Sequence, residues 1–254
     1  MRVKLKYSWE DIKRSSKTKD GILALYIYRK VAHVVTFFFA NFTGVSPNYV
    51  TFLALTSWLS AALLIFYGYS TWAAFFIFFG FVLDCTDGNI ARLKRQTSRK
   101  GKLYDMISDR VGSLSIWIAL GVVYFYKYSN PFVLILEGLL ITVTFVFDML
   151  RYRFEERNKI NIHDTSLVNS YELKIKATMK KFVPFINWDN VVLGVGADLI
   201  WTLLLVSSLY ISIFPAVLLF LLFLEIFSLI VLIKTRSWDN ICSHKKTSNE
   251  GSKA

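Results

Sequence analysis

The amino-acid sequence predicts an all-α integral membrane protein, with six transmembrane helices preceded by an N-terminal amphipathic helix in the membrane interface. The chain has 254 residues, of which 54% are hydrophobic and 17% aromatic. Its apolar residues form repeated runs of about 20 residues, the length that an α-helix needs to cross the hydrocarbon core. Its basic residues lie mainly between these runs, as they do in the inner loops of membrane proteins. These three observations predict one membrane domain.

Residues 1–46 are expected to form a basic segment that ends in the interfacial helix. Residues 21–42 are largely apolar, but Arg29, Lys30 and His33 interrupt them, and the run Val31–Phe42 is too short to span a bilayer comfortably. A helix lying in the interface, with its basic side chains toward the lipid headgroups, fits this pattern better.

Residues 47–233 are expected to form the transmembrane domain, and residues 234–254 a polar tail. Ser46 is a suitable N-cap for the first span, and Pro47 suits the first turn of a helix. The expected spans are Pro47–Tyr67, Thr71–Arg92, Lys100–Tyr126, Pro131–Arg151, Asn190–Tyr210, and a sixth that follows Pro215 and ends near Ile233.

Charge distribution predicts the orientation of these spans. Among the expected outer turns, only Lys127 is basic, whereas the inner segments hold almost all the other lysines and arginines. The positive-inside rule therefore places both termini at the cytoplasmic face of a multi-pass protein of the cell or inner membrane. The net charge of +12 is explained by these loops, so nucleic acid is not an expected partner.

Four aspartates lie near the cytoplasmic ends of the second and third expected spans. Asp84 and Asp87 are three residues apart, and Asp105 and Asp109 are four apart, so each pair shares one helix face. Carboxylates at membrane depth are costly and need a metal, a cation or a water-filled cavity. Four acids that converge from two helices therefore indicate a divalent-metal site with oxygen ligands.

The residues around these acids suit phosphoryl chemistry. Gly88, Ala91 and Gly101 leave room for a ligand, and Arg92 is placed to contact a phosphate. Two divalent ions can clamp a diphosphate and stabilise the charge on the attacking and leaving oxygens. Asp109 is then a candidate base for the proton of an attacking hydroxyl.

Residues 84–109 match the signature D-x2-D-G-x2-A-R-x8-G-x3-D-x3-D without a departure. In this respect the chain resembles the CDP-alcohol phosphotransferase (CDP-alcohol phosphatidyltransferase) family. The resemblance implies a catalytic domain at 47–233 that transfers a substituted phosphate from a CDP-linked lipid or CDP-alcohol donor to a small polar alcohol. CMP would leave, in phospholipid or related polar-lipid biosynthesis.

The resemblance also implies roles for individual residues. Two divalent ions, Mg²⁺ or Mn²⁺, would be held by the four aspartates, with Asp109 also acting as the base. A homodimer is expected as well. For Asn48 a plain helix-capping role stays open as an alternative. The residues implied for the CDP-donor pocket are Asn48, Thr51, Asp84, Gly88, Ala91, Arg92 and Gly101.

Arg110 bears on the acceptor. An Asp-Arg pair at this place resembles the branch that makes phosphatidylinositol phosphate or its archaeal ether-lipid counterpart. Arg110 would then hold an anionic acceptor, with help from Arg151, Arg153 or Arg157. Pairing of Arg110 with an aspartate of the cluster is an equal alternative, and other acceptors stay open.

Two other functions compete with a membrane enzyme. Further acids fall within or near the last three spans, so a six-span ion or proton-coupled transporter is the main alternative. Those acids are Glu137, Asp148, Asp198 and Glu225. Clustering of the four aspartates on one side of the membrane favours catalysis. An inactive, ligand-binding family member has little support, because all four aspartates are present.

Overall fold

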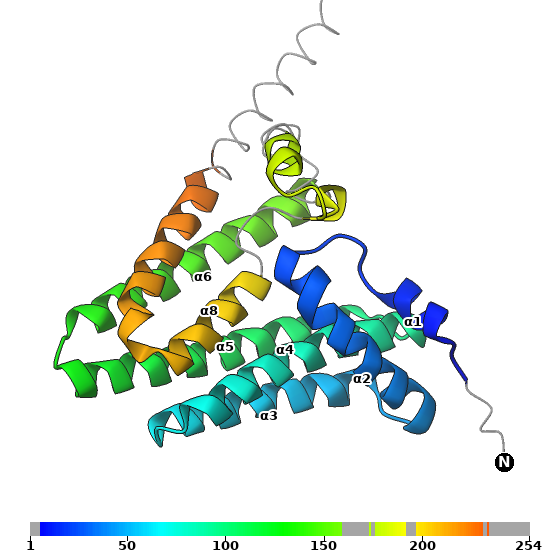
Figure 1. Ribbon diagram of the computed structural model, residues 1–254, viewed down its shortest axis with the longest axis horizontal. Helices are drawn as coiled ribbons and strands as arrows, with labels where there is room; N and C mark the ends of the chain where they lie inside the picture. The colour runs from blue at the N-terminus through cyan, green and yellow to red at the C-terminus, as the bar shows by residue number, and fades with distance from the viewer. Residues whose placement is uncertain (1–5, 159–172, 174–175, 192–196, 231–232, 234–254) are drawn as a thin grey trace, which may run out of the picture. The chain divides into compact units, whose positions relative to one another are not determined.

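The computed structural model describes residues 6–158, 173, 176–191, 197–230 and 233. The regular elements among them are helices, which confirms the all-α class (Figure 1). The chain divides into two compact units. The first comprises residues 1–137, 190–192 and 196–218, and the second comprises residues 138–189, 193–195 and 219–254.

From α2 to α6 the helices follow one another along the chain with short connections. A π-helical stretch, η1, directly precedes α2, and two short 3₁₀ helices, η3 and η4, lie in the C-terminal half. Further helical residues are 176–182 and 214–230. The named elements are α1 (Trp9–Ser15), η1 (Ala24–Tyr28), α2 (Arg29–Phe42), α3 (Pro47–Phe66), α4 (Ser70–Leu93), α5 (Arg99–Tyr128), α6 (Phe132–Asn158), η3 (Trp188–Asn190), α8 (Ala197–Leu209) and η4 (Ile211–Ile213).

Five helices of the described chain are long and apolar enough to cross a membrane. They correspond to the first, second, third, fourth and sixth expected spans. The expected fifth span, Asn190–Tyr210, contains α8, whose 13 residues are fewer than a bilayer crossing needs. Residues 192–196, just before it, lie outside the described part, so the count of six stays a prediction. The five helices are Pro47–Phe66, Ser70–Leu93, Arg99–Tyr128, Phe132–Leu150 and Ile211–Ile230.

The ends of α3 and α5 follow from local sequence. The Ser46 hydroxyl accepts a hydrogen bond from the Tyr49 N–H, with Pro47 in the first turn, as predicted. Gly68 has a φ of +78°, the left-handed conformation that glycine adopts without strain, and it ends α3 in a tight turn. Ser98 caps α5 by accepting from the Gly101 N–H at 3.0 Å.

The core of the first unit centres on Trp58 of α3, which is fully buried. α3 packs against both α4 and α5, and α4 packs against α8. The Trp58 ring stacks on Trp201 of α8 with 4.2 Å between ring centroids. A Cβ added at Gly80 or Gly112 would lie 2.3 Å or 2.4 Å from the Trp58 ring, so these glycines let α4 and α5 approach the indole. This packing holds together the helices that carry the aspartates.

The N-terminal segment is folded onto this core. Arg29 is 5% exposed and forms an ion pair with Asp20. The prediction that Arg29 points toward lipid headgroups is therefore wrong, because Asp20 supplies a carboxylate that compensates its buried charge. His33 packs edge-on against Trp9 of α1, at 6.2 Å between ring centroids. The interfacial position of α2 stays a prediction.

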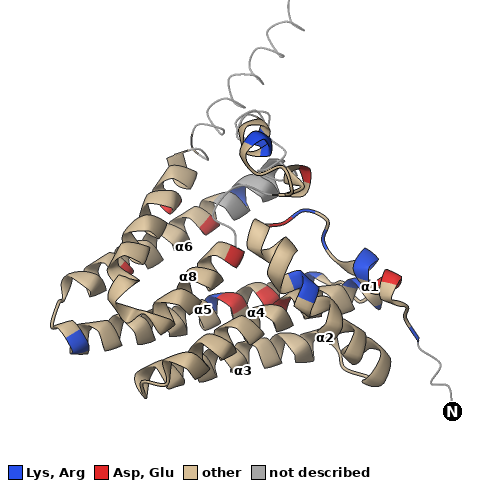
Figure 2. Ribbon diagram, viewed as in Figure 1, with Lys and Arg blue, Asp and Glu red and all other residues tan. Residues whose placement is uncertain are grey.

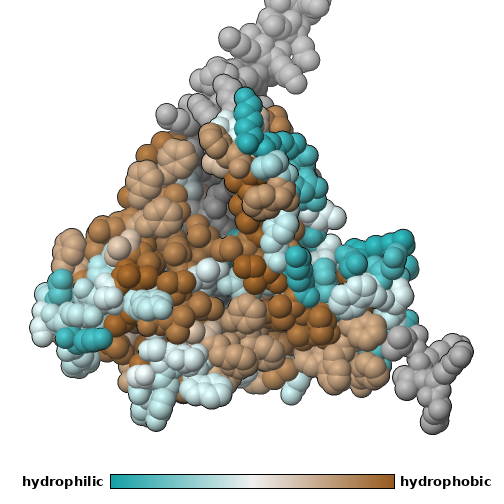
Figure 3. Space-filling model, in the orientation of Figure 1, coloured by the Kyte–Doolittle hydropathy of each residue, from teal (hydrophilic) through white to brown (hydrophobic). Residues whose placement is uncertain are grey.

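The distribution of hydrophobic side chains on the surface is typical of a membrane protein. In Figure 3 hydrophobic side chains dominate the surface over α2 and α3, and hydrophilic residues gather around α1. Exposed large apolar residues occur on every candidate span, for example Leu63, Phe75, Ile118 and Ile135 in the first unit. Because lipid takes the place of water around such residues, their exposure carries no penalty in a bilayer.

In the second unit, α6 presents Phe145 and Met149 outward, and Glu225 is 4% exposed. The predicted tail, residues 234–254, lies outside the described residues. The domain boundaries at residues 46 and 233 stay predictions.

Candidate active site

The four aspartates lie on two helices of the first unit. Asp84 and Asp87 lie in the C-terminal half of α4, and Asp105 and Asp109 lie in the N-terminal half of α5. The connection between the helices is short, so these two ends are neighbours (Figure 2, acidic residues red). The sequence predicted that both pairs converge; the fold brings Asp84 together with Asp105 and Asp109.

Three of the four carboxylates form a compact group. Asp84, Asp105 and Asp109 each offer a carboxylate oxygen, and these atoms lie within 4.8 Å of one another. The Oδ1 atoms of Asp105 and Asp109 are buried and have no hydrogen-bond partner in the part of the chain that the structure describes. An unpartnered buried carboxylate oxygen is costly, and like charges this close repel unless a cation lies between them. The donor set, all hard oxygen, fits Mg²⁺ or Mn²⁺.

Asp87 lies outside that group of three and has a partner on α3. The hydroxyl of Thr51 donates a hydrogen bond to Asp87 Oδ2, and both residues are 5% exposed. Thr51 Oγ1 is also 3.2 Å from the Pro47 carbonyl. The resemblance assigned Thr51 to the donor pocket, and the structure places its hydroxyl on a candidate metal ligand. Thr51 therefore orients Asp87.

Asn48 and Gly101 lie side by side at the start of α3 and α5. A Cβ at Gly101 would be 3.0 Å from Ser98 Oγ and 3.6 Å from Asn48 Oδ1. Ser46, not Asn48, caps α3, so the capping alternative for Asn48 is not supported. The exposed Asn48 amide beside a glycine leaves polar groups free to meet a ligand.

Arg92 connects α4 to the N-terminal segment. Its guanidinium folds back to within 3.3 Å of where a Gly88 Cβ would lie. Its Nη2 donates to Asn89 Oδ1 at 2.9 Å, and its Nε donates to the Ser15 carbonyl. Sequence reasoning missed the contact with Ser15, which lies 77 positions away. Ala91, directly before Arg92 in the sequence, is half-buried.

The candidate acceptor residues are not all placed with the carboxylates. Arg110 is exposed and directly follows Asp109 on α5. Arg151 and Arg153 belong to the second unit, and the Arg153 side chain is exposed there. The acceptor role of these three arginines stays a prediction.

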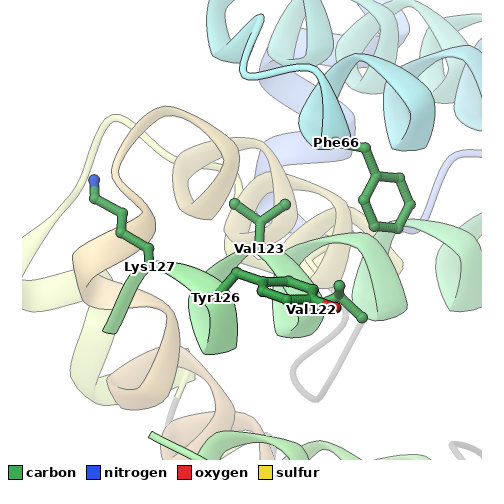
Figure 4. Close-up of a pocket in the computed structure, with 5 residues that line it drawn as sticks. All are labelled: Phe66, Val122, Val123, Tyr126 and Lys127. Atoms are coloured by element: carbon green, nitrogen blue, oxygen red, sulfur yellow. The ribbon is translucent and has the colours of Figure 1, made fainter. Parts of the chain in front are cut away.

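A surface cavity of about 610 Å³ lies near the other end of α5. Figure 4 shows its lining, which is apolar except for the Tyr126 hydroxyl and the Lys127 ammonium. The 13 residues from Asp109 to Val122 correspond to about 20 Å along the helix. The cavity is therefore separate from the carboxylates. Its lining residues are Phe66, Val122, Val123, Tyr126 and Lys127.

Two other acids of the first unit, Asp198 and Glu137, are buried, and hydrogen bonds account for the burial of Asp198. Asp198 accepts hydrogen bonds from the Leu23 and Ala24 N–H groups, at 3.1 Å and 3.2 Å, and so caps the start of η1. Glu137 of α6 lies against Gly121 of α5, and no described residue is a hydrogen-bond partner of its Oε2. We have no physical account of Glu137 beyond this close packing.

Comparison with known proteins agrees with the motif. The family model of the CDP-alcohol phosphatidyltransferases matches residues 44–186, more than half of the chain. A CDP-diacylglycerol–glycerol-3-phosphate 3-phosphatidyltransferase of Cereibacter sphaeroides is 35% identical over 105 residues. The match covers 40% of this chain and 46% of that relative, so it spans less than half of either protein.

Neither finding supports the transporter alternative. The family match includes α3, α4 and α5, and with them all four aspartates, Asn48, Thr51 and Arg92. The motif, the grouping of carboxylates and the extent of the match agree: the chain belongs to the CDP-alcohol phosphatidyltransferase family.

Proposed function

We propose that the chain transfers a phosphatidyl-type group from a CDP-linked donor to an alcohol, with release of CMP, in a reaction that needs Mg²⁺ or Mn²⁺. The observation that carries the proposal is the group of three carboxylates, two of which have a buried oxygen without a hydrogen-bond partner among the described residues. The group lies within the segment that matches the family model.

The four aspartates would share the work of holding metal and moving a proton. Asp84, Asp87 and Asp105 would be ligands, and Asp109 would both bind metal and accept the proton of the attacking hydroxyl. Bound divalent ions would neutralise the charge that builds on the transferred phosphate. In the transfer, a bond forms between the acceptor oxygen and the lipid-bearing phosphorus, and the bond from that phosphorus to CMP breaks.

The residues around the cluster would hold the donor. Asn48 and Gly101 lie together at the start of α3 and α5, and Gly88 and Arg92 lie together on α4. Backbone exposed by glycine and the Arg92 guanidinium are suited to a diphosphate.

We propose an acceptor that itself carries a phosphate. Arg110 offers a cation beside Asp109, and the Cereibacter relative is named for glycerol 3-phosphate. Inositol 1-phosphate, the acceptor implied by the Asp-Arg pair, has the same anionic group. Glycerol 3-phosphate and inositol 1-phosphate, the two candidate acceptors, thus have a phosphate group in common.

We place the carboxylates and both termini at the cytoplasmic face, because the basic residues gather on that side of the expected spans. A water-soluble acceptor and released CMP would then exchange with the cytoplasm, while the donor's lipid part stays in the bilayer. A homodimer is proposed on the family resemblance alone.

The test is CMP release by the purified, detergent-solubilised chain, given CDP-diacylglycerol and Mn²⁺. The acceptor panel would be glycerol 3-phosphate, inositol 1-phosphate, free inositol and serine. We expect CMP with a phosphorylated acceptor, loss of CMP on chelation, and recovery when Mn²⁺ is added in excess. Absence of both CMP release and metal-dependent CDP binding would refute the proposal.

A further inference from the structure

The loop of residues 16–20, which joins α1 to η1, is fixed in place by contacts with α2 and with the segment before α8. Arg29 of α2 donates to Ser16 Oγ at 2.9 Å and, through Nε, to Asp20 Oδ2 at 2.9 Å. The Asp20 N–H donates to the Asn190 carbonyl at 3.1 Å. Because Arg29 is buried, this ion pair is shielded from solvent and holds both ends of the 16–20 loop.

The residue just before the loop is tied to the aspartate-bearing helix. The Ser15 carbonyl accepts a hydrogen bond from Arg92 Nε, and Ser15 is 8% exposed. Arg92 lies on α4, eight positions after Asp84 in the sequence. The 16–20 loop is thereby anchored at the end of α4 that carries the carboxylates. Figure 2 shows this loop, with its basic and acidic residues, running from α1 toward η1.

This anchoring brings a cation to the carboxylates. Lys17 is two residues beyond Ser15, whose carbonyl is bonded to Arg92, so it lies at the end of α4 that carries the carboxylates. Its positive charge acts on Asp84, Asp105 and Asp109, the three residues that form the compact group. The Lys17 side chain is exposed, and no carboxylate of the described residues lies within 4.0 Å of it. Lys17 is therefore near the cluster without being paired to it.

The balance of charge between the aspartates, the expected metal ions and Lys17 indicates that Lys17 binds an anion. Two divalent ions would neutralise four carboxylates, so the ammonium of Lys17 would have no carboxylate left to compensate. A nearby surplus cation attracts an anion, and lysine is a common phosphate ligand because it presents a compact, strongly hydrated charge on a flexible stem.

We propose that Lys17 contacts a phosphate group of a substrate bound at the carboxylate cluster, carried either by the CDP-linked donor or by a phosphorylated acceptor. The inference rests on the proposed function. It adds to that function a binding residue that lies outside both the signature at 84–109 and the family match at 44–186.

The test compares Lys17→Ala with Lys19→Ala, a matched change at an exposed lysine of the same loop. For Lys17→Ala we expect KM for one phosphate-bearing substrate to rise about 10-fold, as expected for loss of a charged hydrogen bond. The value of kcat should change much less, and Lys17→Arg should recover part of the affinity. Lys19→Ala should behave as the unmodified chain.

Two binding measurements separate the sources of the phosphate. Weaker Mn²⁺-dependent CDP binding by Lys17→Ala would identify the donor's phosphate. Unchanged CDP binding with a raised KM for glycerol 3-phosphate would identify the acceptor's phosphate. Mn²⁺ affinity should be unchanged or higher in Lys17→Ala, because a cation near the metal site has been removed.

Two outcomes would overturn the role of Lys17, and a third would refute the proposed function. Equal KM values and equal CDP affinities for the Lys17 and Lys19 variants would overturn that role. Weaker Mn²⁺ binding by Lys17→Ala would also overturn it, since Lys17 would then support the fold of the cluster. Absence of both CMP release and metal-dependent CDP binding in the unmodified chain would refute the proposed function itself, whereas CMP release by the unmodified chain with equal KM values and equal CDP affinities in the two variants would refute only the role of Lys17.

Discussion

Loss of the hydrogen bond from Thr51 to Asp87 is expected to weaken the binding of Mn²⁺ by an amount that can be calculated from the type of bond. Thr51→Val removes the hydroxyl while keeping the branched shape of the side chain, so the tight packing around this 5%-exposed residue is retained. Asp87 then loses the donor on α3 that fixes its carboxylate. We expect the affinity for Mn²⁺ to fall while the chain stays folded.

The magnitude follows from the kind of bond that is lost. A hydrogen bond to a charged group contributes about 1.5–3 kcal/mol, which corresponds to a factor of about 10–150 in an equilibrium constant. Loss of a group that orients a metal ligand costs about 10–100-fold in metal affinity or activity, in agreement with that range. Since the Thr51–Asp87 bond is buried, solvent screening reduces it little.

The assay is the Mn²⁺ concentration that gives half-maximal CMP release. For Thr51→Val this concentration should rise about 10-fold or more. Thr51→Ser is the control, because it keeps the hydroxyl that reaches Asp87 and should stay close to the unmodified chain. An unchanged Mn²⁺ dependence in Thr51→Val would refute the conclusion that Thr51 orients Asp87.

Two further predictions concern packing and pH. Gly121→Ala would place a Cβ 1.7 Å from Glu137 Oε2, so it should lower the free energy of unfolding by about 1–3 kcal/mol. Thermal unfolding in detergent should show a smaller loss when Glu137→Ala is also present, and no loss for Gly138→Ala, whose added Cβ meets no atom within 4 Å. Burial, followed by the charges of Arg29 and Lys13, lowers the pKa of His33 below its usual 6.5. The unfolded chain therefore binds the proton more readily, so packing of Trp9 on His33 should weaken as pH falls below about 6.5. Trp9 fluorescence should report this change, and the same pH response in His33→Gln would contradict it.

The sequence was most informative where hydropathy and local motifs act. Pro47–Tyr67 was predicted as a span and α3 covers Pro47–Phe66, because a long apolar run bounded by a Ser-Pro cap has few other stable structures in a membrane. The spacing of the four aspartates predicted that their side chains share helix faces, and three of them meet within 4.8 Å.

Contacts between distant segments could not be predicted in the same way. Arg92 bonds to Ser15, and Thr51 bonds to Asp87, across 77 and 36 positions, and no local pattern encodes either pair. Arg29 was misassigned because its position in an apolar stretch resembles an interfacial cation. Only the fold reveals that Asp20 accompanies it into the interior.

Stacking of Trp58 on Trp201 is a further example. Hydropathy places both residues in apolar runs, but it does not tell which aromatic side chains face lipid and which face another helix. Gly80 and Gly112 are the residues that could have indicated this packing, since a glycine within an apolar span often marks a close helix contact.

The central claim is that the carboxylate cluster is a metal-dependent catalytic centre. Its most direct test is CMP release against Mn²⁺ concentration for the unmodified chain, Asp105→Asn and Asp109→Asn, with the exposed acid variant Glu10→Gln as a control. Each variant must first be shown to remain in the membrane fraction. We predict that both cluster variants release no CMP at any Mn²⁺ concentration, whereas Glu10→Gln matches the unmodified chain. Turnover by Asp105→Asn and Asp109→Asn at the rate of the unmodified chain would contradict the claim.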